Sequence, residues 1–344
     1  MQASVRRVSL SLAALLALAP AGVRAQQGLD ELLPRAAQTA YRGRKVVVDF
    51  SHASPQVTSM TVLCQPGGRE RREFHATHGL LVVDGEFSWQ YLPEQGVVLK
   101  RPSRGEGGEL LRPEQLRRAL VSYEVRVAPS DPVAGRRSRA LEFIPRQGGS
   151  RPRRRIWVDE ETGLVLRTEV YGTDSRLSRL TVFEALEYRP TLDAAAFTMR
   201  VPAGARVVEA APESCLEPEE AGRVAGLPVA LPAYLPAGFA RQCIRARRQR
   251  DYGEVQVVYG DGLSLLSLFE STGLRDPGGA AAGPPVAVGR WTGRWHEMGL
   301  VTGISWGTPG AHFALLGELS REELRRIAGS VAGREELSSA GRRP

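Results

Sequence analysis

Short runs in which apolar and polar residues alternate follow one another along the first two thirds of the chain. Val46, Val48 and Phe50 share one side of the first run, and Asp49 lies on the other side. A period of two predicts β-strands. Comparable runs occupy residues 57–64, 70–76, 79–83, 86–92, 96–101, 121–128, 137–145, 153–159, 163–171 and 177–189.

The connections between these runs are short and rich in turn-forming residues, as at Asp84-Gly85. Connections of a few residues join antiparallel neighbours, whereas parallel strands need long crossovers. The fold class predicted is therefore α+β with mostly antiparallel strands. Helical spacing predicts only an early helix at 29–42 and a short one at 113–120, with Pro113 at its first position.

A second group of strands begins after residue 226 and contains a clear hairpin signal. Gly260-Asp261-Gly262 separates the apolar runs "VQVVY" and "LSLLSLF", and these residues tolerate the positive φ angles of a tight turn. Both faces of the predicted ribbon are apolar, so both need a cover. Ser320 and Glu323 form a capping box for a final helix, whose apolar stripe offers one cover and ends at Gly333; the stripe consists of Leu324, Ile327, Ala328 and Val331.

The N-terminal segment has the features of a secretory signal. Arg6 and Arg7 precede the apolar stretch 8–19, and Val23-Arg24-Ala25 offers small residues at a cleavage site. We expect an exported, periplasmic protein. The expected organisation is a signal peptide at 1–25, a first domain at 26–208, an acidic linker at 209–226, a smaller α+β domain at 227–332 and a tail at 333–344.

Charge and cysteine content narrow the classes of partner. The formal charge of +8 is carried almost entirely by arginine; on an exported chain, acidic peptides or anionic head groups are better candidates than nucleic acid. Of Cys64, Cys215 and Cys243, the last two flank the start of the second domain, and we expect them to form a disulfide. Closing that loop stabilises the fold by roughly 3 kcal/mol.

No motif for catalysis, a cofactor or a metal is convincing. Ser305 lies in a G-x-S-x-G pentapeptide, but the helix that a nucleophile elbow requires does not follow it. His75 and His78 lack the spacing that would join them on one helical face. The basic run 151–155 is interpreted as a solvated turn, with an anion contact as the alternative. We expect a protein that is not an enzyme.

Apolar residues give a stronger lead than polar ones. The predicted sheet has more apolar surface than its helices can cover, and such a sheet can curl into a half-barrel around an acyl chain or an apolar peptide. The candidate lining residues, chosen by alternation, are Val46, Val48, Phe50, Met60, Phe87, Trp89 and Tyr91.

Several short motifs, taken in order, resemble the RseB/MucB family of periplasmic sigma-factor regulators. They include "YRGRKVVVDF", "DGEFSWQYLPEQGVVLKRP", "YGDGLSLLSLFES", "VGRWTGRWHEMGLVTGISWG" and "LSREELRRIAGSV". The resemblance covers most of residues 28–332. It implies a LolA-like incomplete barrel followed by a smaller α+β domain that binds a partner.

The resemblance also implies a function. Family members bind the extracytoplasmic part of a membrane-spanning anti-sigma factor, shield it from proteolysis and release it when a lipid-type signal binds. A LolA-type lipid or lipoprotein carrier is the alternative, and homo-oligomerisation stays open. The candidate partner-binding residues are Tyr259, Phe269, Trp291, Trp295 and Trp306.

Overall fold

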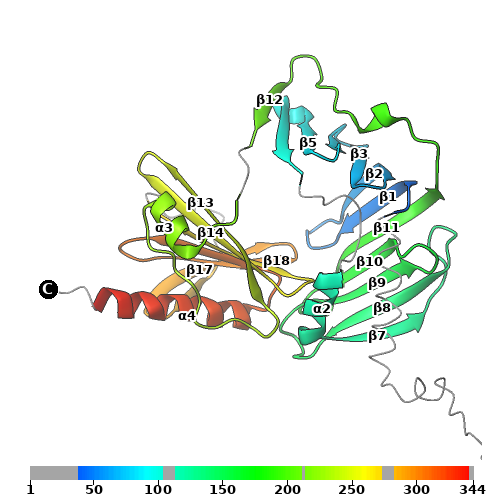
Figure 1. The fold of residues 1–344 in the computed structure, drawn as a ribbon. Coiled ribbons are helices and arrows are strands. Elements are labelled where there is room, and N and C mark those ends of the chain that lie inside the picture. The colour runs from blue at the N-terminus through cyan, green and yellow to red at the C-terminus, as the bar shows by residue number, and fades with distance from the viewer. Residues whose placement is uncertain (1–37, 104–112, 211–213, 273–282, 341–344) are drawn as a thin grey trace, which may run out of the picture.

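The computed structural model describes residues 38–103, 113–210, 214–272 and 283–340. Two sheets dominate this part of the chain (Figure 1). The predicted signal peptide and most of the predicted helix at 29–42 lie outside the described residues. The end of that predicted helix is strand instead, since β1 begins at Tyr41. No helix in the described part of the chain is long and apolar enough to cross a membrane.

The first sheet has twelve strands in the order β12-β6-β5-β4-β3-β2-β1-β11-β10-β9-β8-β7. Only the β12–β6 pair is parallel, so the expectation of a mostly antiparallel sheet is confirmed. The strands are β1 (Tyr41–Asp49), β2 (Gln56–Gln65), β3 (Arg69–Phe74), β4 (Leu80–Val83), β5 (Phe87–Leu92), β6 (Val97–Pro102), β7 (Tyr123–Pro129), β8 (Ser138–Pro145), β9 (Arg153–Asp159), β10 (Val165–Tyr171), β11 (Leu177–Tyr188) and β12 (Arg206–Glu209).

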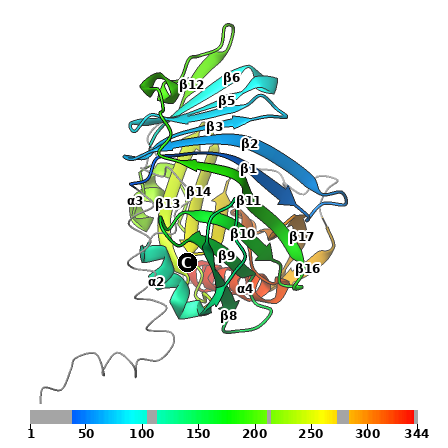
Figure 2. The same ribbon diagram turned by 90° about the vertical axis from the view of Figure 1, so that its right-hand side faces the viewer.

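This sheet curves into an incomplete barrel, because its edge strands β12 and β7 do not pair with each other (Figures 1 and 2). Helix α2 (Pro113–Ser122) covers the inner face near β8 and β9, where Leu116 and Ala119 pack on Leu141 and Phe143. The segment between β11 and β12, which contains η4 (Ala194–Phe197), crosses the outer face of the sheet (Figures 1 and 2).

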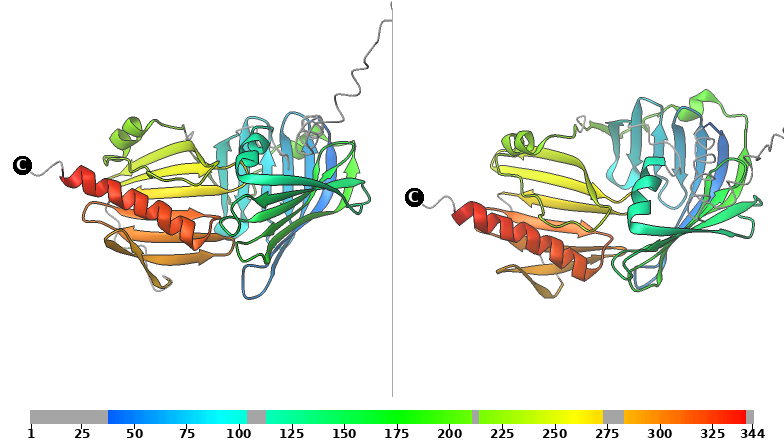
Figure 3. Two further views of the ribbon diagram at one scale, coloured as in Figure 1. Left: turned by 90° about the horizontal axis from the view of Figure 1, so that it is seen from below. Right: turned by 60° about the horizontal axis from the view of Figure 1, so that its bottom comes forward.

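The second sheet has seven antiparallel strands in the order β13-β14-β15-β19-β18-β17-β16. These are β13 (Ala240–Gln249), β14 (Tyr252–Gly260), β15 (Leu265–Ser271), β16 (Pro285–Val288), β17 (Trp291–Met298), β18 (Val301–Gly307) and β19 (His312–Gly317). Helix α4 (Arg321–Ala340) lies along one face (Figure 3). Its predicted apolar stripe, which includes Leu324 and Ile327, is fully buried there. The helix extends seven residues past Gly333, where the sequence predicts its end.

The stretch 209–226, interpreted from the sequence as a linker, contains helix α3 (Pro218–Ala225). Ala221 and Ala225 of α3 belong to the core of the second sheet. Gly226 ends the helix in the left-handed conformation. A helix of only eight residues shows too few periods for the sequence to reveal it, and its two small core residues carry no strong apolar signal.

Candidate functional site

The turn of the predicted β14–β15 hairpin is where the second sheet docks on the first. Asp261 Oδ1 accepts hydrogen bonds from the backbone N–H groups of Leu263 and Ser264 at 3.0 and 2.8 Å, which closes the turn. Leu263 packs against the core beneath α2. Gly262 has a φ of +99°, and a Cβ there would lie 2.1 Å from the carbonyl oxygen of Gln115. The turn therefore requires glycine both for its backbone angle and for its approach to α2.

A buried ion pair crosses the same junction. Arg151 Nη1 donates to Asp261 Oδ2 at 2.8 Å, and the two side chains are 2% and 0% exposed. Arg151 also donates to the carbonyl oxygen of Ala237 at 3.2 Å, and that oxygen accepts a bond from Ser122 Oγ at 2.6 Å. Two buried charges with these partners fix the position of one sheet against the other, because either charge alone would be strongly unfavourable.

Tyr123 lies next to this ion pair. Its hydroxyl is 3.4 Å from Ser264 Oγ, and the Arg151 guanidinium lies 5.8 Å from its ring centroid. Burial raises the pKa of Tyr123 to about 12, and the negative charge of Asp261 acts in the same direction. The phenol therefore remains neutral at physiological pH and serves as a packing and hydrogen-bonding group.

A second bridge lies beside a crevice between the sheets. Arg154 pairs with Glu318, and the N–H of Ser320 donates to the carbonyl oxygen of Ser150 at 2.9 Å. The crevice has a volume of about 460 Å³. Phe50, a predicted cavity residue that is 39% exposed, lines it together with residues of both sheets, including Leu177 and Leu300.

The basic run 151–155 is thus not a solvated turn. Arg151 is buried at the junction, Arg154 reaches the second sheet, and Arg153 and Arg155 stack on aromatic rings of the first sheet. Two of these arginines find carboxylates that lie more than 100 residues away in the chain. Such distant partners leave no local trace in the sequence.

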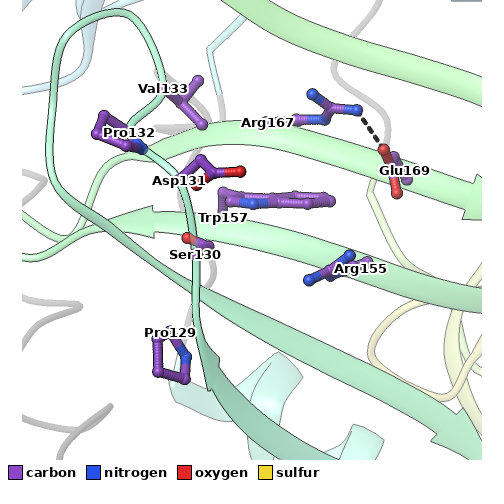
Figure 4. A pocket seen from close by; sticks show the side chains of 9 residues that line it. All are labelled: Pro129, Ser130, Asp131, Pro132, Val133, Arg155, Trp157, Arg167 and Glu169. Carbon is purple, nitrogen blue, oxygen red and sulfur yellow. Dashed lines mark hydrogen bonds and ion pairs between the residues drawn. The ribbon is translucent and has the colours of Figure 1, made fainter.

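A pocket of about 560 Å³ opens on the outer face of the first sheet (Figure 4). Its floor consists of Arg155 and Trp157 of β9 with Arg167 and Glu169 of β10, and its wall is the loop 129–133. The sequence analysis missed this site. The sequence "RRRIWVD" alternates arginine and tryptophan on one side of a strand, which is the only local trace of the pocket. The sequence analysis interpreted this stretch as part of a turn and a strand, and it proposed no binding site there.

The predicted lipid-cavity residues do not converge on the inner face. The strand register puts Trp89 opposite Val82, Val82 opposite Arg71, Arg71 opposite Leu63, and Leu63 opposite Arg42. These residues therefore share a face, and Arg71 donates from it to η4 on the outside. By alternation along β1 and β5, the same outer face holds four more of the candidates, namely Val46, Val48, Phe87 and Tyr91.

Only Met60 among the seven candidates lies on the inner side of the sheet. It pairs with Lys45 and Phe74 and belongs to a buried cluster with Val62 and Phe183. Alternation does not separate the two sides of these strands, because both sides are apolar. The outer side is apolar in part because η4 and its neighbours cover it. If the wrong alternate residues of a strand are taken as the inward-facing ones, every side chain of that strand is assigned to the wrong face of the sheet.

Most of the predicted partner-binding aromatics belong to the core of the second sheet. Tyr259, Trp295 and Trp306 are buried beneath the helices, and Trp306 stacks on Phe313 with ring centroids 5.0 Å apart. These three side chains are therefore almost inaccessible to a partner in this structure. Trp291 is partly buried against the same core. Phe269 lies on the opposite, open face, because it is in register with Gln256 and Ala314 rather than with core residues.

The cysteines divide as the sequence suggests. Cys215 and Cys243 form a disulfide with Cα atoms 4.9 Å apart, which ties the segment before α3 to β13. Cys64 is buried as a free thiol on the inner face. Burial raises the pKa of the Cys64 thiol to about 11, and the charge of Glu70 adds to the effect. The thiol is therefore protonated and unreactive in the folded protein.

Ser305 and the histidines do not form a catalytic or metal site. Ser305 lies within β18 rather than at a strand-to-helix turn, and its hydroxyl is 2.7 Å from His296 Nε2. Ser305 is the only hydrogen-bonding partner of the His296 side chain among the described residues. The ring of His75 contacts Ser59 and Thr61 on the outer face. No group of three metal-ligating side chains occurs in the described part of the chain.

These features define a class of protein: an incomplete antiparallel barrel joined through a charged, buried junction to a smaller α+β sheet. The chain is similar to solved structures of MucB. The structure of MucB in complex with MucA(peri) matches with a TM-score of 0.57 and 21% identity, covering 89% of this chain and 97% of that chain.

Two further structures agree. The MucA/MucB complex of Pseudomonas aeruginosa matches with a TM-score of 0.57 and 20% identity, over 89% of this chain and 98% of that one. MucB alone matches with a TM-score of 0.51 and 17% identity, over 91% and 98%. At these identities the likeness establishes the fold. No curated protein matches the chain.

Residues 88–201 match the family model of the MucB/RseB N-terminal domain. This segment runs from β5 to the end of the segment that contains η4, so it includes α2 and the outer pocket. Over this segment the chain is similar to the MucB/RseB N-terminal domain, and its two-sheet fold is similar to that of MucB.

Proposed function

We propose that the protein is an exported regulator of an envelope-stress sigma factor. It binds the extracytoplasmic part of a membrane-spanning anti-sigma factor and shields that segment from proteolysis until an apolar signal releases it. The observation that carries this proposal is the likeness to MucB in complex with MucA(peri), which extends over both sheets and covers 97% of that chain.

The open face of the second sheet is the surface we assign to the partner. Phe269 and Leu316 lie there half-buried, whereas α3 and α4 cover the opposite face. We assign the apolar signal to the inner face of the first sheet, where Met60 and Phe74 pair. For the signal to release the partner, the protein must bind it more tightly in the released form than in the complex.

The alternative, a lipid or lipoprotein carrier, needs only the first sheet. The second sheet has its own core of buried residues, two helices and a disulfide. It is also fixed to the first sheet by buried charges. This dedicated unit favours a partner-binding role over a carrier.

A proteolysis assay tests the shielding step. The extracytoplasmic segment of the anti-sigma factor is incubated with the envelope protease that cleaves it, with and without residues 26–344 of this protein. We expect the protein to slow cleavage at least tenfold, and added lauric acid to restore the rate. Cleavage at the same rate with and without the protein would refute the shielding role.

A further inference from the structure

The outer pocket is built around a tryptophan between two arginines. The guanidinium carbons of Arg155 and Arg167 lie 4.7 and 4.8 Å from the Trp157 ring centroid (Figure 4). At these distances each guanidinium makes a cation–π contact with the ring. The pocket therefore presents cations whose positions are held by the tryptophan.

The two arginines differ in their partners. Arg167 pairs with Glu169, and Glu169 also accepts a hydrogen bond from the Tyr171 hydroxyl at 2.7 Å. Both oxygens of that carboxylate are thus engaged. Arg155 forms an ion pair with Glu142, whose oxygen lies 3.4 Å from Arg155 Nε. This distance exceeds that of a charge-assisted hydrogen bond. The Nε atoms of both arginines are buried without a hydrogen-bonding partner among the described residues, so the two arginines differ in their ion pairs.

The opposite side of the pocket is the loop 129–133, which combines three apolar residues with Ser130 and Asp131. Pro129, Pro132 and Val133 form the wall, and Asp131 from the same loop projects toward Trp157 (Figure 4). The volume of about 560 Å³ is that of a small-molecule site. Trp157 is only 6% exposed and forms the base of the pocket. An apolar body therefore has Pro129 and Pro132 of the loop to rest on, with its polar end at Arg155.

We propose that this outer pocket binds a small organic carboxylate, with the carboxylate at Arg155 and an apolar body against Pro129 and Pro132 of the loop 129–133. Arg155 has the longer ion pair of the two arginines, and its one positive charge matches a single negative charge. The carboxylates of Asp131, Glu142 and Glu169 disfavour a dianion in the same space. This site lies on the outer face, apart from both surfaces assigned to the anti-sigma factor and the apolar signal, so it stands or falls independently of the proposed function.

Ligand-detected NMR and calorimetric titration at pH 8 test the proposal with three probes of the same body. These are phenylacetate, its neutral amide phenylacetamide and the dianion phenyl phosphate. We expect the wild-type protein to bind phenylacetate at least tenfold more tightly than either of the others. Arg155→Gln should weaken phenylacetate binding at least tenfold. Arg42→Gln serves as the matched control, because Arg42 is exposed on β1 and pairs with Glu187.

Each remaining outcome decides against the site. Equal affinity for the acid and the amide, or undiminished binding by Arg155→Gln, would overturn it, and tighter binding of phenyl phosphate would overturn the carboxylate assignment. If circular dichroism shows that Arg155→Gln is unfolded, Asp131→Asn takes its place. Asp131 is exposed, and removal of its charge should tighten phenylacetate binding about threefold; no change would contradict the proposal.

Discussion

At the scale of single residues, buried charge is the distinguishing feature of this molecule. Arg151 and Asp261 lie 110 residues apart in the chain and are both almost completely buried. Asp261 has two tasks, since one oxygen closes the hairpin turn and the other accepts from Arg151. Because both groups lose their hydration on folding, the intact pair adds little net stability. Removal of one partner is nevertheless strongly destabilising, because it leaves the other charge buried and unpaired.

Arg151→Met should lower the free energy of unfolding by about 3–5 kcal/mol, because it leaves the Asp261 carboxylate buried and unpaired. The double variant Arg151→Met with Asp261→Asn should recover most of this loss, since asparagine keeps the turn bonds and removes the charge. Urea unfolding followed by circular dichroism measures both.

Arg42→Ala provides the control for this comparison. Its ion pair with Glu187 is exposed on both sides, so its loss should change stability by less than about 1 kcal/mol. A single Arg151→Met variant as stable as this control would show that the junction does not depend on the buried pair.

At the scale of elements, the β14–β15 hairpin connects the two halves of the molecule. Its turn packs on α2, so a local sequence signal for a tight turn is also a long-range contact. Glycine at position 262 serves both functions. A methyl group added at position 262 would therefore have two energetic effects. One is backbone strain from the positive φ, and the other is a steric clash with α2.

Gly262→Ala should therefore destabilise the protein more than Gly67→Ala. Both residues have positive φ angles, +99° and +86°, but a Cβ at position 67 meets no atom within 4 Å. We expect about 1–2 kcal/mol for Gly67→Ala from strain alone and a further 1–3 kcal/mol for Gly262→Ala from the clash. Thermal unfolding of the two variants measures both losses of stability. Equal losses for the two variants would mean that the hairpin turn is not in tight contact with α2.

The elements themselves were largely predictable, whereas their faces were not. A period of two identified most strands of the first sheet, the turn signal identified the β14–β15 hairpin of the second, and Pro113 marked the start of α2. Alternation could not tell inside from outside in β1 and β5, because the register that fixes the face involves β2, β3 and β4. For the same reason Trp295 and Trp306 resembled contact residues although α4 buries them.

At the scale of the whole molecule, the candidate sites occupy different surfaces. The outer pocket lies over β9 and β10, the crevice lies between the sheets, and the open face carrying Phe269 belongs to the second sheet. Arg151 and Arg154 contact the second sheet from the same strand region that supplies Arg155 to the pocket. The junction is therefore the structural path between the first sheet and the proposed partner surface.

Affinity capture of the protein from an extract of its own cell envelope tests the central claim most directly. Tagged residues 26–344 serve as bait, an unrelated exported protein serves as the control, and mass spectrometry identifies bound proteins and lipids. The regulator account predicts specific recovery of a single-pass membrane protein with a cytoplasmic sigma-binding segment. Recovery of lipids or lipoproteins without such a protein would contradict it and favour the carrier.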